Sequence, residues 1–213
     1  MRAIVEGQGI KHVVHFTRVS NLPGVLQYGL LGRQTLVSEG FRSDINDQYR
    51  FDYLPNAVCC SPSFPNYKMF YRLRVSNPGV DWAVIRLSPS LLWEKRCVFC
   101  ISNAATREIA AEGIETRMTS DAFQAMFSDH PNMPDRSTLG IPNNYTTNPQ
   151  AEVLVLDPIE PRYMLDVLVD DKNRVNDFET LAQLIRPYRE RIKFYHAKKY
   201  FDARADYAHW RTE

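Results

Sequence analysis

The first readable unit of the chain is an apolar strand that runs directly into an amphipathic helix. Residues 13–17 read Val-Val-His-Phe-Thr, and Leu22, Val25 and Leu26 then recur at the spacing of one helix face. A Ser-Asn pair and a proline stand where this helix begins, and Gly29 can end it. The pattern predicts a strand, a turn and a short helix.

Strand-like and helix-like patterns alternate along the rest of the chain. Apolar runs typical of strands recur at 57–61, 81–88, 97–102, 152–157, 163–171 and 193–197. Helical patterns stand at 63–76, 88–95, 119–129 and 178–192. Residues 129–149 contain four prolines and no periodicity, so they predict a long loop of the kind that often carries function.

Strands outnumber long helices, and several connections are too short for repeated right-handed crossovers. The pattern therefore predicts an α+β fold with mostly antiparallel central sheets flanked by short helices. We expect one domain over residues 1–213, because no shift in composition marks a second. The dinucleotide-fold, P-loop and zincin motifs are missing from the sequence, which excludes those three readings.

Composition narrows the class of protein without identifying it. Hydrophobic residues make up 44% of the chain, the formal net charge is +1, and no apolar run approaches the roughly 20 residues of a membrane span. We expect a cytoplasmic protein with no membrane partner. Cys59-Cys60 and Cys97-x-x-Cys100 suit free buried thiols better than a tetrahedral metal, so we expect no metal site.

Three side chains are candidates for chemistry: His15 in the first strand, Arg50 in a polar segment, and Glu152 at the start of the run Val-Leu-Val-Leu. Each has an ordinary alternative, such as a structural histidine or a surface ion pair of small energy. Glu152 is the strongest candidate of the three, because a carboxylate at the edge of an apolar strand risks costly desolvation. An imidazole, a guanidinium and a carboxylate could together bind a ribose and a phosphate.

Several segments, in order along the chain, resemble the DarT family of bacterial toxins that ADP-ribosylate DNA with NAD. The first is HVVHFTRVSNLPGVLQYGLL, a strand ending in His-x-Thr that enters an Asn-Leu helix. The others are DQYRFDYLPNAVCCSPSFPNYKMFY, CVFCISNAA and QAEVLV, the last similar to the family's catalytic strand. The matches cover most of the chain through about residue 157 and are far weaker after it.

The resemblance implies an ADP-ribosyltransferase fold with NAD as co-substrate. Glu152 would be the catalytic carboxylate that hydrogen-bonds the nicotinamide ribose and steadies the positive charge of the transition state. His15 would bind a ribose hydroxyl, with Thr17 and Asn21 near the cofactor. Arg50 would contact the phosphates of NAD or orient it, and it is also a candidate catalytic residue. Arg42 is the alternative for this cofactor arginine. Ser61 would lie beside the nicotinamide.

On the acceptor side, the resemblance implies that the loop before Glu152 reads the substrate, with four candidate residues: Asn143, Asn144, Tyr145 and Thr147. A base must be unpaired before an enzyme reaches its nitrogens, which favours single-stranded DNA. The chain would be the toxin of a toxin and antitoxin pair, with an ADP-ribose-removing macrodomain-type antitoxin as partner. The segment carrying Arg50 departs from the thymidine-modifying pattern, which favours a divergent branch with guanine as its acceptor.

Two alternatives remain open at this stage. One keeps the fold and NAD but changes the acceptor to RNA, as in the transferases that move an RNA 2′-phosphate onto NAD, or to a protein side chain. The other is a catalytically silent nucleic-acid-binding module that uses the basic and aromatic residues near the C-terminus, although a net charge of +1 disfavours a purely electrostatic binder.

Overall fold

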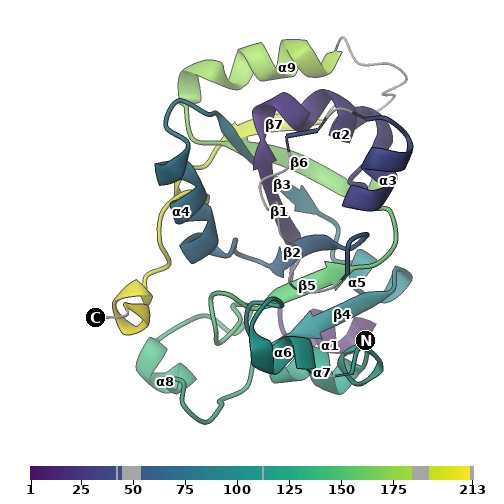
Figure 1. The fold of residues 1–213 in the computed structure, drawn as a ribbon. Coiled ribbons are helices and arrows are strands. Elements are labelled where there is room, and N and C mark those ends of the chain that lie inside the picture. The colour runs from purple at the N-terminus through teal and green to yellow at the C-terminus, as the bar shows by residue number, and fades with distance from the viewer. Residues whose placement is uncertain (42, 45–53, 112, 184–191, 212–213) are drawn as a thin grey trace.

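The fold is built on one seven-stranded sheet with the strand order β4-β5-β2-β1-β3-β6-β7. The computed structural model describes residues 1–41, 43–44, 54–111, 113–183 and 192–211. Every neighbouring pair of strands is antiparallel except β6 and β7, which run parallel. The strands are β1 (Val13–Arg18), β2 (Val58–Pro62), β3 (Trp82–Leu87), β4 (Cys97–Cys100), β5 (Glu152–Val155), β6 (Met164–Val169) and β7 (Lys193–His196). The predicted α+β class is confirmed (Figure 1).

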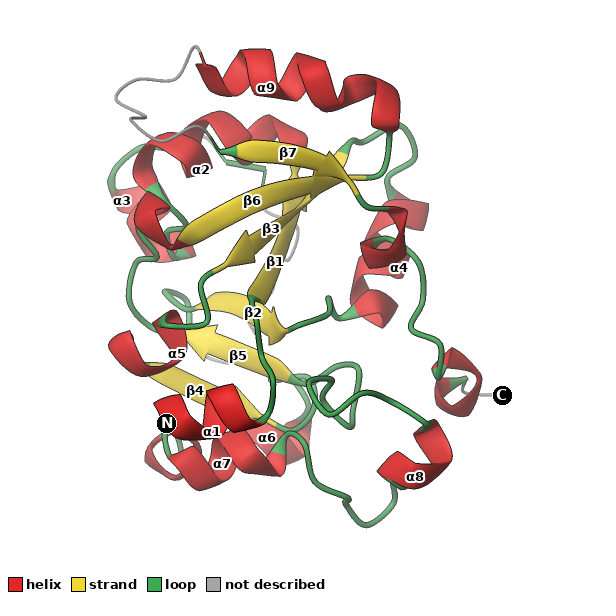
Figure 2. Cartoon of the chain, turned by 180° about the vertical axis from the view of Figure 1, so that it is seen from behind, coloured by secondary structure: helices red, strands yellow, loops and turns green. Residues whose placement is uncertain are grey.

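Short helices surround the sheet (Figure 2). The α-helices are α1 (Arg2–Gly7), α2 (Leu22–Tyr28), α3 (Arg33–Ser38), α4 (Tyr67–Ser76), α5 (Leu91–Glu94), α6 (Arg107–Ala111), α7 (Ser120–Ala125), α8 (Arg136–Leu139) and α9 (Val175–Gln183). Turns of 3-10 helix lie at Val19–Asn21, Glu115–Arg117, Pro161–Tyr163, Lys172–Arg174, Lys198–Tyr200 and Tyr207–Trp210. None of the helices described is long and apolar enough to cross a membrane.

The sequence patterns located the strands and several of the helices, with the following differences. Helices α3 and α6 fall in segments for which no helix was predicted. Helix α1 was not predicted, since only Val5 of its six residues is buried and no periodic face marks it. Helix α8 interrupts the predicted loop 129–149 for four residues and ends at Gly140, which takes a left-handed conformation. Helix α9 starts earlier than predicted, and residues 184–191 of the predicted helix lie outside the described part of the chain.

Apolar side chains pack on both faces of the sheet. The larger core includes Val13, Leu26, Ile85 and Phe123, all under 2% exposed, from strands β1 and β3 and helices α2 and α7. A second cluster on the other face centres on Phe70 of α4. Because both faces of the sheet are covered, most residues of each strand are apolar. This is why the strands could be recognised in the sequence. All four cysteines are free; Cys60, Cys97 and Cys100 are buried as predicted, whereas Cys59 is only partly buried.

The sheet changes character between β1 and β2. These strands pair at only two positions, Val13 with Pro62 and Val14 with Ser61. Beyond them β1 continues along β3 through Arg18, while the rest of β2 pairs with β5. The two half-sheets, visible as the upper and lower groups of strands in Figure 2, therefore diverge from this short junction.

Candidate active site

A cavity of about 280 Å³ opens where the two half-sheets diverge. Its walls come from β1, α2, β2, the start of α4, the turn 103–105 and Glu152, the first residue of β5. Its size lies near the lower end of the usual range for small-molecule sites, roughly 300–1,000 Å³. The divergence of the strands thus creates a site without a break in the core.

Glu152 is held from two sides within the cavity wall. One carboxylate oxygen accepts a hydrogen bond from the backbone N–H of Ala104 at 3.0 Å, and the other accepts from Nδ2 of Asn66 at 3.4 Å. Only 7% of the Glu152 surface is exposed. The two hydrogen bonds offset part of the cost of burying a carboxylate and fix its orientation. A fixed anion at a cavity wall is the arrangement that stabilises developing positive charge.

Asn66 couples Glu152 to helix α4. Its side-chain oxygen accepts from the backbone N–H of Met69 and caps α4, while its amide nitrogen donates to Glu152. The residue is 1% exposed. An Asn serves both roles because its amide carries an acceptor and a donor. Sequence reasoning missed this residue, although an Asn directly before a helical pattern is a recognisable cap signal.

His15 lines the cavity, and one of its two ring nitrogens is engaged with the backbone of β2. Its Nδ1 lies 2.8 Å from the backbone oxygen of Cys59, so Nδ1 carries the proton and donates, which leaves Nε2 as an acceptor. Burial lowers the pKa of His15, and the hydrogen bond to Cys59 opposes this only in part. The imidazole is therefore neutral at pH 7, in the form that accepts a hydrogen bond from a hydroxyl.

Thr17, Asn21 and Ser61 also line the cavity, so the structure brings together all the described residues predicted to bind the cofactor. Nδ2 of Asn21 donates to Oγ1 of Thr17 and to the backbone oxygen of Asp44, each at 3.0 Å. The Asn21 side chain thus makes no helix-capping hydrogen bond, although the residue stands at the N-cap position of α2. Arg50 and its competitor Arg42 both lie outside the described residues.

None of the four predicted acceptor residues lines the cavity. Nδ2 of Asn144 donates to Ser63 at 3.2 Å, the ring of Tyr145 packs on Phe64, and Asn143 is exposed. Thr147 is fully buried, and its hydroxyl donates to the backbone oxygen of Ser128 at 2.7 Å. The position of Thr147 is that of a residue that holds the loop, because no face of it is open to a ligand.

The fold is shared with solved structures of ADP-ribosyltransferases. Thermus sp. 2.9 DarT in complex with ADP-ribosylated ssDNA aligns with a TM-score of 0.62 at 13% identity over 91% of this chain and 97% of that chain. The same protein in complex with NAD+ gives 0.57 at 14% identity over 90% and 98%. Thermosipho africanus DarTG in complex with ADP-ribose gives 0.60 at 15% identity and covers 90% of this chain but 51% of that chain.

The family follows from the sequence itself. Residues 14–201 match the family model described as "ssDNA thymidine ADP-ribosyltransferase, DarT". The chain belongs to the DarT family of ADP-ribosyltransferases. This chain spans nearly all of the Thermus protein and about half of the Thermosipho chain. A search of curated protein sequences finds no match.

Proposed function

We propose that this protein transfers ADP-ribose from NAD+ to a base of single-stranded DNA, with Glu152 as the catalytic carboxylate. The observation that carries the proposal is the anchored Glu152 in a cavity wall of a chain that matches the DarT family over residues 14–201. The Thermus relative has been solved both with NAD+ and with ADP-ribosylated ssDNA, which makes these the first ligands to consider.

The cavity wall suits a dinucleotide of this kind. Hydroxyl and amide groups of Thr17, Asn21 and Ser61 and the accepting nitrogen of His15 offer hydrogen bonds to ribose and amide groups. Apolar neighbours on the same wall, such as Leu30, suit the flat ring systems. An arginine from the segment that includes Arg42 and Arg50 would supply the phosphate contact, for which a guanidinium fork is well matched.

Glu152 would act on both halves of the reaction. As the bond between the ribose C1′ and the nicotinamide nitrogen breaks, its electron pair leaves with nicotinamide, and positive charge grows on the ribose. A carboxylate fixed by Ala104 and Asn66 stabilises that charge without having to reorganise. The base nitrogen then bonds to C1′, and Glu152 accepts the proton that the nitrogen releases.

The base that accepts ADP-ribose is the finer part of the proposal. The family description makes thymidine the first candidate. The sequence departures near Arg50 and the unusual CCSPSFPNYKMF segment favour guanine instead. Both candidates require an unpaired base, because the reacting nitrogens of a duplex are engaged in pairing.

The test is intact-mass analysis of short single-stranded oligonucleotides after incubation with protein and NAD+. Each oligonucleotide carries one kind of reactive base, and Glu152→Gln runs in parallel with Glu6→Gln, which changes an exposed glutamate of α1. We expect a gain of one ADP-ribose on one base with the wild-type and Glu6→Gln proteins, and none with Glu152→Gln. If NAD+ is consumed but no DNA is labelled, the acceptor is RNA or protein. If no NAD+ is consumed, the chain is a catalytically silent nucleic-acid-binding module.

We propose a cognate antitoxin as the protein partner. The Thermosipho structure is described as DarTG, and a chain that modifies DNA needs an activity that removes ADP-ribose if its host is to survive. Expression of the intact chain should arrest growth, and Glu152→Gln should relieve the arrest. Equal toxicity of the two proteins would contradict the role given to Glu152.

A further inference from the structure

The loop that leads into Glu152 is irregular in conformation but buried along part of its length. Residues 142–148 contain no helix or strand, yet Thr146, Thr147 and Asn148 are 5%, 0% and 8% exposed. A buried loop must satisfy its backbone polar groups by other means than a ladder of strands. The partners that satisfy them show what holds this part of the molecule in place.

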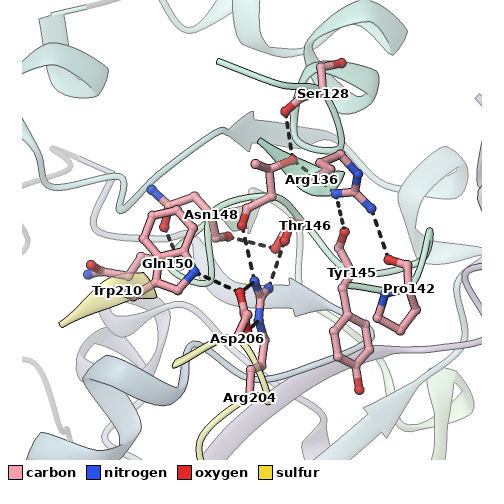
Figure 3. Close-up of polar contacts among 11 residues, drawn as sticks. Ser128, Arg136, Pro142, Tyr145, Thr146, Asn148, Gln150, Arg204, Asp206 and Trp210 are labelled. Carbon is pink, nitrogen blue, oxygen red and sulfur yellow. Dashed lines mark hydrogen bonds and ion pairs between the residues drawn. The ribbon is translucent and has the colours of Figure 1, made fainter. Parts of the chain in front are cut away.

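One set of partners comes from the loop's own neighbourhood. Arg136 of α8 donates to the backbone oxygens of Tyr145 at 2.8 Å and Pro142 at 3.0 Å, and to Oγ1 of Thr147. Nδ2 of Asn148 donates to Oγ of Ser102 at 3.1 Å, beside the turn that binds Glu152. These contacts hold one side of the loop against α8, as Figure 3 shows for the hydrogen bonds of Arg136, and against Ser102, next to the turn 103–105.

The other set comes from residues about 60 positions further along the chain. Arg204 donates to the backbone oxygens of Thr146 at 2.8 Å and Thr147 at 3.2 Å. Its Nε donates to Oδ1 of Asp206 at 2.9 Å, and its Nη2 donates to Oδ2 of the same residue. Figure 3 shows Arg204 lying between the carboxylate of Asp206 and the loop. One guanidinium thus joins two neighbouring carbonyls and a buried acid.

The ion pair is fully enclosed. The side chains of Arg204 and Asp206 are 2% and 0% exposed, and Nε1 of Trp210 donates to Asp206 at 2.8 Å. Burial raises the pKa of Asp206, but hydrogen bonds from Arg204 and Trp210 outweigh it and lower the pKa below its ordinary value. Lys68 of α4 donates to the backbone oxygen of Trp210 at 2.9 Å, which ties the same segment to the helix that Asn66 caps.

We propose that Arg204, fixed by Asp206 and Trp210, is a positioning residue that sets the acceptor side of the site by holding the loop 142–148. The proposal rests on the proposed function. Arg204, Asp206 and Trp210 all lie beyond residues 14–201, the part of the chain that matches the family model. The segment therefore adds to the site from outside the matched range. Its target loop continues through Asn148 into the strand that begins with Glu152.

Two reactions distinguish the positioning of the acceptor base from the cleavage of NAD+. Water can replace the base as acceptor, so NAD+ hydrolysis without DNA depends on Glu152 and the cavity, whereas transfer also depends on where the base is held. Displacement of a positioned reactant by about 1 Å costs on the order of 100-fold in rate. A loosened loop should therefore reduce transfer far more than hydrolysis.

The experiment uses Arg204→Lys and Trp210→Phe in the full chain. Lys keeps the charge but cannot join two carbonyls and a carboxylate in one plane. Trp210→Phe keeps an aromatic ring but removes the N–H that reaches Asp206, together with one of the two fused rings. Arg96→Lys is the matched control, since Arg96 also pairs with an aspartate, Asp157, but on the exposed surface. Rates of hydrolysis and of transfer to an oligonucleotide, kcat/KM for the oligonucleotide, and amide hydrogen exchange of residues 142–148 are measured.

We expect Arg204→Lys to lower kcat/KM for the oligonucleotide at least about tenfold more than it slows NAD+ hydrolysis, with faster exchange at Thr147. Trp210→Phe should change the same quantities in the same direction by less, and Arg96→Lys should match the wild type. Equal losses in hydrolysis and transfer, or an unchanged kcat/KM for the oligonucleotide, would overturn this inference alone. A wild-type protein that transfers nothing to DNA would overturn the proposed function and the inference together.

Discussion

The two walls of the site are built in different ways. The cofactor wall, defined here as β1, α2 and the start of β2, consists largely of one continuous stretch in which His15, Thr17 and Asn21 lie within seven residues. The acceptor wall, our name for residues 142–148 in the proposed site, lies outside the residues that line the cavity and depends on Arg136 and on Arg204, which lies far along the chain. Local sequence builds the first wall, and long-range contacts hold the second. Damage to each should therefore have a distinct signature.

The largest expected effect is a loss of stability when a buried side chain behind the cofactor wall is shortened. Leu26 of α2 is 1% exposed, so Leu26→Ala should destabilise the protein by roughly 2–5 kcal/mol through lost burial and a residual cavity. Urea unfolding measures the loss, and Val37→Ala on the exposed face of α3 is the control. A loss no larger than that of the control would contradict the packing of α2 described here.

Next comes the end of the same helix. Gly29 has a φ of +91°, and a Cβ there would meet the backbone of Ile159, which pairs with Leu30. Gly29→Ala should cost roughly 2–4 kcal/mol from strain and steric clash together. We expect it to raise the KM for NAD+ more than that for DNA. Gly7→Ala, where a Cβ meets nothing within 4 Å, is the control. A larger increase in the KM for DNA than in the KM for NAD+ would contradict the assignment of α2 to the cofactor wall.

The acceptor wall is probed by removing one hydroxyl. Thr147→Val leaves the backbone oxygen of Ser128 and one donor of Arg136 without this partner, which should cost roughly 1–3 kcal/mol. Transfer to DNA should fall more than NAD+ hydrolysis, in contrast to Gly29→Ala. Thr138→Val on the exposed side of α8 serves as the comparison. A uniform loss of both reactions would show that the loop supports the whole site equally.

The smallest effect is a dependence on pH from the cofactor wall. The pKa of His15 is lowered by burial, so between that value and about 6.5 the unfolded chain binds more protons than the folded protein. Stability should be complete above about pH 6.5 and decline as the pH falls below it. His15→Gln should flatten this decline in thermal unfolding, leaving the contribution of His12, whose pKa is also lowered. An unaltered profile would contradict the buried neutral imidazole.

Sequence reasoning located the cofactor wall because its signals are local. The apolar strand, the apolar face of α2 and the terminal Gly29 are all visible within residues 13–29. Glu152 was selected as a candidate for a related reason, since an acid that opens an apolar run is conspicuous at its own position. These features need no knowledge of the distant parts of the chain.

The anchors of the site were not predicted, because their roles arise only after folding. Asn66 reads as an ordinary helix cap until β5 brings Glu152 beside it. Arg204 and Asp206 read as surface charges in a polar segment, although they are fully buried against the loop. Thr147 was assigned to substrate because of its place in a loop, whereas the packing beneath that loop encloses it. A pattern of polar residues does not reveal which of them face inward.

The distance along the chain between the acceptor loop and Arg204 also has a consequence during synthesis. Thr146 and Thr147 precede by 58 and 57 positions the arginine that binds their carbonyls. Because domains generally fold as units, the site forms only once Arg204 has been made. Synthesis that stops before Arg204 would leave a chain that contains His15, Asn66 and Glu152 but lacks the second set of contacts to the loop.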